Sequence, residues 1–168
     1  MTEHRVSFEA ISVNTIDELS VRFYQRFEGI LAERDGRISV SVYTDAESGF
    51  AAARSVIEDL ETVGFSIVRV DLDLVDSPEI AERLNVSRQA VNNWARGSRG
   101  RGFPHPLGSP GGKRIWSWGQ ITEWAATNHR KFRGPSALSL DDAVAIDHFL
   151  AQRRAAVTGG SRAHIRGA

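Results

Sequence analysis

Hydrogen-bonding side chains gather in residues 87–96, around the apolar residues Val91 and Trp94. If this segment is a helix with those two residues facing inward, the remaining polar side chains face outward or flank the buried face. They are Ser87, Arg88, Gln89, Asn92, Asn93 and Arg96. Arginine can donate two hydrogen bonds to the edge of a guanine, and glutamine or asparagine can pair in a similar way with adenine. We therefore expect Arg88, Gln89 and Asn92 to read base edges. The other three side chains are expected to contact phosphate, and the alternative is a merely solvated helix surface.

A shorter helix is expected just before this segment. Asp76 or Ser77 can cap its first turn, in which Pro78 loses no hydrogen bond. Its apolar face consists of Ile80, Ala81 and Leu84. Asn85 tolerates the left-handed conformation that a sharp turn needs, and Ser87 can cap the helix that follows. Two short helices joined in this way predict a helix-turn-helix.

Glycine and proline dominate the stretch that follows, residues 97–114. Residues 103–106 fit an edge strand but not a central one, because proline donates no ladder hydrogen bond. A turn at residues 109–112 and a returning strand at 113–116 would complete a hairpin, or wing, and Ser117 can cap a helix that runs to about residue 128. Four basic side chains would lie along the wing and suit phosphate or minor-groove contact. They are Arg99, Arg101, Lys113 and Arg114.

This order of elements resembles the MerR-like and excisionase-like winged helix-turn-helix family. The resemblance rests on Phe-Pro-x-Pro at 103–106, a glycine turn, Arg-x-Trp at 114–116 and Ile-x-x-Trp at 121–124. It covers roughly residues 74–128, and it implies DNA binding through the second helix and the wing, with frequent dimerisation. It does not imply a MerR-type metal sensor, because the chain contains no cysteine. The tryptophans Trp116, Trp118 and Trp124 are expected in the core rather than stacked on bases.

Charge is distributed unevenly although the net charge is zero. Residues 1–75 hold fourteen acidic and seven basic residues, whereas residues 76–137 hold four acidic and ten basic ones. A basic middle part favours an anionic partner. The split also raises the hypothesis that the acidic part docks on the basic surface and holds the protein off DNA.

An acidic α/β domain is expected over residues 1–75. Strands over 6–13, 38–42 and 68–74, with helices over 15–33 and 48–63, give a βαβαβ pattern. Both helices would cover one face of the sheet, and a bulge is expected at residues 10–11. No glycine-rich loop follows the first strand, so no nucleotide cradle is expected. Asp71 and Asp73 are expected on the solvent face of the last strand rather than in a metal site.

The expected fold class is therefore α+β: the N-terminal βαβαβ domain, the winged helix-turn-helix over residues 76–129, and a C-terminal helix. Residues 130–157 would form a linker and that helix, capped by Ser139, and residues 158–168 a tail. The helix must pack on the rest of the chain or on a second copy.

Together these features predict a cytoplasmic, sequence-specific protein that binds double-stranded DNA, regulates transcription and forms a homodimer. No catalytic residues, metal site or cofactor are expected. No apolar stretch approaches the roughly 18 residues of a membrane-spanning helix, and the first residues lack the apolar centre of a signal peptide. Two alternatives remain: an antitoxin or adaptor whose N-terminal domain binds a protein partner, and an excisionase-like architectural DNA-binding factor.

Overall fold

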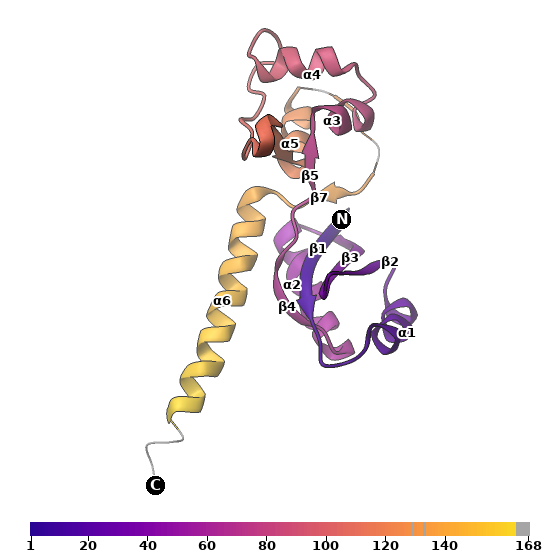
Figure 1. Ribbon diagram of the computed structural model, residues 1–168, viewed down its shortest axis with the longest axis vertical. Coiled ribbons are helices and arrows are strands. Elements are labelled where there is room, and N and C mark those ends of the chain that lie inside the picture. The colour runs from indigo at the N-terminus through magenta and orange to yellow at the C-terminus, as the bar shows by residue number, and fades with distance from the viewer. Residues whose placement is uncertain (129, 133, 164–168) are drawn as a thin grey trace.

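The computed structural model describes residues 1–128, 130–132 and 134–163, and it is a mixed α+β structure with two hydrophobic clusters (Figure 1). The first cluster is built, in chain order, from β1 (Thr2–Ile11), α1 (Ile16–Arg26), β2 (Gly29–Arg34), β3 (Arg37–Ala46), α2 (Gly49–Val63) and β4 (Ser66–Val70). These strands lie in the order β2-β3-β1-β4, each antiparallel to its neighbours, and β7 (Ser136–Ala137) pairs in parallel with β1. The connectivity is that of a split βαβ, or ferredoxin-like, arrangement. The expected βαβαβ pattern is wrong by one strand.

The additional strand lies within the helix expected over residues 15–33. α1 begins at the Thr15 cap as expected but is only 11 residues long. β2 then pairs with β3 through a two-residue turn at Asp35 and Gly36, whose φ angles are 54° and 75°. Positive φ at both central residues makes a type I′ hairpin, for which Asp-Gly is a preferred sequence. Strand pairing therefore outweighs the helical spacing of the apolar residues around Leu31.

One face of the sheet forms the core of the first cluster. Val6, Phe8 and Ala10 of β1 are buried and alternate with half-buried side chains that face the other way. The expected bulge is present one residue earlier, since the register with β4 shifts between Glu9 and Ala10. α2 covers this face and runs, as expected, from the Ser48 cap to Gly64, which has a left-handed φ of 118°.

The strand expected over residues 68–74 is divided between two sheets. β4 ends at Val70, and β5 (Leu74–Asp76) pairs antiparallel with β6 (Ile115–Ser117). Residues 71–73 cross between the sheets and belong to no strand. The expectation that Asp71 and Asp73 project from a strand is therefore wrong. Asp71 instead accepts a hydrogen bond from the Ser39 hydroxyl at 3.0 Å, and Asp73 forms ion pairs with two arginines.

The second cluster is formed by β5, β6 and three helices: α3 (Ser77–Arg83), α4 (Arg88–Ala95) and α5 (Trp118–Thr127). Trp116, Trp118 and Trp124 are buried, which confirms their expected place in the core. Figure 1 shows this cluster at the upper end of the molecule and the larger sheet below it.

The C-terminal helix packs within the chain. α6 (Leu140–Ala163) buries Ala143, Ile146 and Leu150 in the first cluster, and Asp147 accepts the backbone N–H of Val70 at 2.8 Å. The helix continues into the segment expected to be a tail, of which residues 164–168 lie outside the described residues. None of the helices in the described ranges is long and apolar enough to cross a membrane.

Candidate nucleic-acid interface

Two short helices are joined by a tight turn, and each has its own cap. Asp76 caps α3 in a capping box with Glu79, and Ser87 caps α4 by accepting the backbone N–H of Ala90 at 3.1 Å. Asn85 adopts a φ of 53°, the left-handed conformation expected from the sequence. Because of that turn, the N–H of Val86 reaches back to the carbonyl of Ala81 at 2.9 Å. Such a closing hydrogen bond fixes the angle at which the second helix leaves the first.

An aromatic cluster holds the glycine-rich loop against α4. The ring of Phe103 lies 6.0 Å from that of Trp94 and 4.9 Å from that of Trp124. The indole N–H of Trp124 donates to the carbonyl of Arg101 at 3.2 Å. Gly100 lies against the Trp94 ring so closely that a Cβ there would be 2.6 Å from Cδ1. These contacts replace strand pairing as the means of fixing this part of the loop.

The expected edge strand over residues 103–106 is absent from the structure. The carbonyl of Pro104 accepts the indole N–H of Trp116 at 3.0 Å, and strand-like bonding is limited to a bridge between Gly108 and Ile115. The physical reason is that two prolines in four residues remove the N–H groups that a ladder needs. The returning segment is found as β6, but its strand partner is β5 rather than the first half of a hairpin.

The polar side chains predicted for α4 lie on its outer surface. Arg88, Gln89 and Arg96 are exposed, whereas Asn92 and Asn93 are half-buried at the two sides of that surface. The buried Val91 and Trp94 fix this orientation, because positions three and four apart share one helical face. The inward pair used in the sequence analysis is therefore confirmed.

Asn92 lies on the side of α4 that faces the returning strand. The Nη2 of Arg114 donates to its Oδ1 at 3.4 Å, and the Arg114 guanidinium also lies 5.8 Å from the centre of the Trp116 ring. The structure thus places Arg114, which the sequence assigns to the wing, beside α4.

A hollow of about 640 Å³ borders the opposite side of α4. Ser87, Gln89 and Asn93 line it from the helix, and Arg99 lines it from the loop. Arg130, which the sequence predicts to lie in a linker, also lines it. Its guanidinium lies over the Trp94 ring, 4.2 Å from the centre. No local pattern around Arg130 indicates this, because the position depends on how the chain returns after α5.

The other two wing residues lie elsewhere. The Nζ of Lys113 is 2.5 Å from Oδ2 of Asp76, and this bond lowers the pKa of the Asp76 carboxyl, with a further contribution from the Glu79 backbone N–H. Arg101 lines a separate hollow together with Glu123 and Asp141. Of the ten predicted residues, these two are not placed beside α4 by any contact in the described residues.

The surface around α4 is strongly cationic. The forty residues from Arg83 to Thr122 contain seven arginines and lysines and no aspartate or glutamate. In the described part of the chain, ion pairs engage two of the seven, Arg83 with Asp73 and Lys113 with Asp76. Figure 1 shows α4 at the end of the molecule farthest from the sheet, so the acidic N-terminal part does not cover it. The hypothesis of docking on the basic surface is wrong for this arrangement.

Within residues 1–128, 130–132 and 134–163, no group of three or more histidines, aspartates or glutamates is arranged to hold a metal ion. Comparisons of the chain with protein-family models, with curated proteins and with solved structures give no match.

Proposed function

We propose that this chain is a double-stranded DNA-binding protein that regulates transcription. In this proposal α3 and α4 form a helix-turn-helix, and the segment from Gly97 to Trp116 is its wing. The observation that carries the proposal is the outer surface of α4. It presents hydrogen-bonding side chains at the free end of the molecule, with Arg114 on one side and Arg99 and Arg130 on the other.

The geometry supports a division of roles among these residues. A recognition helix contacts bases mainly through its N-terminal residues, which favours Arg88, Gln89 and Asn92 for base contacts. Arg99, Arg114 and Arg130 stand beside the helix, where they suit contacts to the phosphates that border the major groove. Each bidentate base contact is worth about 1–3 kcal/mol of discrimination between bases.

We also propose that two copies act together. A single module of this size buries about 600–1,000 Å² on DNA, and a dimer with half-sites one helical turn apart gives a longer recognised sequence. Strand β2 is an edge of the sheet. The N–H of Tyr43 donates to the carbonyl of Glu28 at 3.0 Å, so the alternate residues Gly29, Leu31 and Glu33 turn their backbone groups outward.

The sequence of this edge is complementary to itself when two copies run antiparallel. With Leu31 opposite Leu31 of the second copy, Glu28 lies opposite Arg34 at both ends, and Ile30 lies opposite Ala32. Ile30 and the neighbouring Tyr24 are 50% and 57% exposed in the single chain. The N–H of Leu31 donates to the Tyr24 hydroxyl at 3.3 Å, a bond that the second strand would replace. An isologous two-fold interface requires this kind of self-complementarity.

The test is selection of genomic DNA fragments by the purified protein, followed by sequencing. The wild type is compared with Arg88→Ala/Asn92→Ala and with Arg54→Ala, which removes an exposed arginine on α2. We expect a shared motif that is lost in the double variant and kept in the control. Diffuse recovery in all three proteins would show phosphate-driven binding only and would contradict a sequence-specific regulator. Cooperative coating that depends on DNA length would instead favour an architectural factor.

A further inference from the structure

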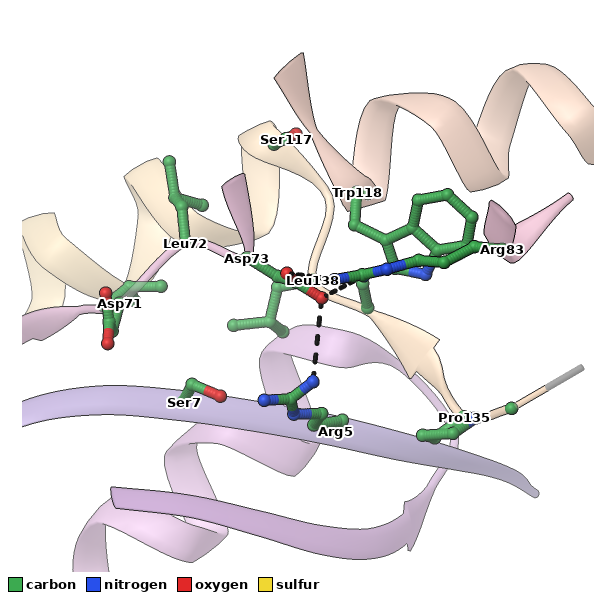
Figure 2. Close-up of a pocket in the computed structure, with 14 residues that line it drawn as sticks. Arg5, Ser7, Asp71, Leu72, Asp73, Arg83, Ser117, Trp118, Pro135 and Leu138 are labelled. Atoms are coloured by element: carbon green, nitrogen blue, oxygen red, sulfur yellow. Dashed lines mark hydrogen bonds and ion pairs between the residues drawn. The ribbon is translucent and has the colours of Figure 1, made fainter. Parts of the chain in front are cut away.

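A cavity of about 270 Å³ lies between the two hydrophobic clusters (Figure 2). One wall is formed by Arg5 and Ser7 of β1, and another by the crossing segment, residues 71–73. The remaining walls come from Arg83 of α3, from Trp118 at the start of α5, and from Leu138. The volume is close to the lower end of the range found for small-molecule sites. The cavity therefore lies between the sheet and helices α3 and α5, against which α4 packs.

Arg5 enters this cavity with few partners. It lies on the face of β1 opposite the buried Val6, and Figure 2 shows its guanidinium turned toward Asp73. The closest distance between the two charged groups is 3.6 Å, too long for a normal hydrogen bond. The Nε of Arg5 is buried and has no hydrogen-bond partner among the described residues. Burial of an unsatisfied donor on a charged group is costly.

Asp73 lies closer to Arg83 than to Arg5. The two nitrogens of the Arg83 fork lie 2.7 and 3.1 Å from its two oxygens. This bond raises the pKa of Arg83 further above its ordinary value, and the guanidinium stacks 4.9 Å from the centre of the Trp118 ring. Asp73 is thus bound tightly by Arg83 and only at 3.6 Å by Arg5, and no hydrogen bond from the Arg5 guanidinium is found among the described residues.

We propose that this cavity binds a small molecule with one carboxylate, which accepts hydrogen bonds from the guanidinium of Arg5. A planar carboxylate matches the fork of an arginine. The side chains of Leu72, Trp118 and Leu138 provide apolar walls for a short hydrocarbon or aromatic body. Asp71 and Asp73 also line the cavity, so a second negative charge on the ligand would be repelled. About 36% of the Arg5 side chain is exposed, which provides a route of entry.

The position of the cavity gives this site a regulatory role, and this part of the inference rests on the proposed DNA-binding function. A ligand held by Arg5 would contact the neighbours of the Asp73–Arg83 pair. Arg83 stands on α3, whose C-terminal end leads directly into the turn before α4. Occupancy would therefore change DNA affinity by favouring one orientation of the two clusters.

The test uses the full chain with ¹⁵N-labelled arginine and two probes of similar shape, benzoate and the neutral benzamide. We expect benzoate at millimolar concentration to shift and sharpen the Nε–H signal of Arg5 and to change the fluorescence of Trp118. Benzamide should do neither. Arg5→Gln should weaken benzoate binding at least tenfold, whereas Arg37→Gln, on the same sheet but outside the cavity, should leave it unchanged.

Three results would overturn the site. The first is no response to benzoate even at 10-fold the concentration tested first, and the second is an equal response to benzoate and benzamide. The third is benzoate binding by Arg5→Gln as tight as that of the wild type, with an unchanged thermal midpoint. The readout is binding to the protein alone, so it is independent of DNA. Failure of DNA binding with a functioning cavity, or the reverse, would therefore be distinguished.

Discussion

The carboxylate of Asp76 links the start of α3 to the glycine-rich loop. One of its oxygens accepts the backbone N–H of Glu79 at 2.9 Å, and the other lies 2.5 Å from Nζ of Lys113. Residues 76 and 113 are far apart in the sequence, and this pair holds β6 and the loop before it against the cap of the first helix.

This relationship predicts a dependence of stability on pH. The hydrogen bond from Lys113 lowers the pKa of Asp76, so the unfolded state binds the proton more readily, and the stabilisation is present above the ordinary carboxyl pKa. It is lost as the pH falls through the lower pKa of the folded state. Asp76→Asn should cost no more than about 1 kcal/mol at pH 7, because Lys113 is largely exposed.

Urea unfolding of the wild type and Asp76→Asn across the acid range measures this difference. The gap between the two proteins should close as the pH falls below the ordinary pKa of aspartate. A gap that is equally large at the lowest pH would show that the charge on Asp76 contributes nothing.

Glu123 on α5 should show the opposite dependence. Partial burial of its carboxyl group raises its pKa, and the nearby Asp141 and Asp142 raise it further. The folded state therefore binds the proton more readily. Glu123 destabilises the protein progressively as the pH rises from the ordinary pKa of glutamate to the higher pKa of the folded state. Glu123→Gln should stabilise the protein at neutral pH by a few tenths of a kcal/mol, a figure reduced because the residue is exposed. Thermal unfolding at pH 7 and at pH 4 tests this, and a larger gain at pH 4 would contradict the proposed cause.

Gly100 should tolerate no side chain. Its φ of 78° favours glycine, and an added Cβ would lie 2.6 Å from the Trp94 ring. Gly100→Ala should therefore destabilise the second cluster by about 1–3 kcal/mol. Gly97→Ala is a matched control, because its φ is 75° and nothing lies within 4 Å of the added Cβ. In denaturant titrations we expect Gly100→Ala to lose more free energy of unfolding than Gly97→Ala. Equal losses would mean that backbone strain, rather than contact with Trp94, makes glycine necessary.

Arg130 should contribute to DNA affinity without reading sequence. Arg130→Ala should weaken binding to all sequences by a similar factor and reduce the slope of log affinity against log salt by about 1. Arg130→Lys keeps the charge but loses the planar stacking on Trp94, so it should restore the slope and only part of the affinity. Binding titrations at four salt concentrations check this. An unchanged slope in Arg130→Ala would remove the residue from the interface.

Charge reversal along β2 tests the dimer. Arg34→Glu and Glu28→Arg should each raise the dimer dissociation constant, since each places like charges opposite one another. The double variant Glu28→Arg/Arg34→Glu should recover dimerisation, because the opposed charges match again. Sedimentation equilibrium measures the three constants beside that of the wild type. A wild type that remains monomeric with and without DNA, or a double variant weaker than both single ones, would rule out this interface.

The sequence by itself determined the features whose hydrogen bonds close within a few residues. Asp76, one of the two candidates, caps α3, Ser87 and Ser117 cap α4 and α5 as predicted, and Asn85 takes the left-handed turn. The inward face of α4 followed from the spacing of Val91 and Trp94. The Asp-Gly pair at residues 35–36 carried the hairpin signal too, but the apolar spacing before it also fits a helix, and only pairing with β3 decides between the two.

The tertiary structure decided where distant segments meet. The sequence predicts one strand over residues 68–74, which divides because β4 pairs with β1 whereas β5 pairs with β6. Arg130 reaches Trp94, and Arg5 reaches the cavity beside Asp73, through the course of the whole chain. Such contacts depend on burial shared between elements far apart in the sequence, and local propensity contains no information about which partner each element will find.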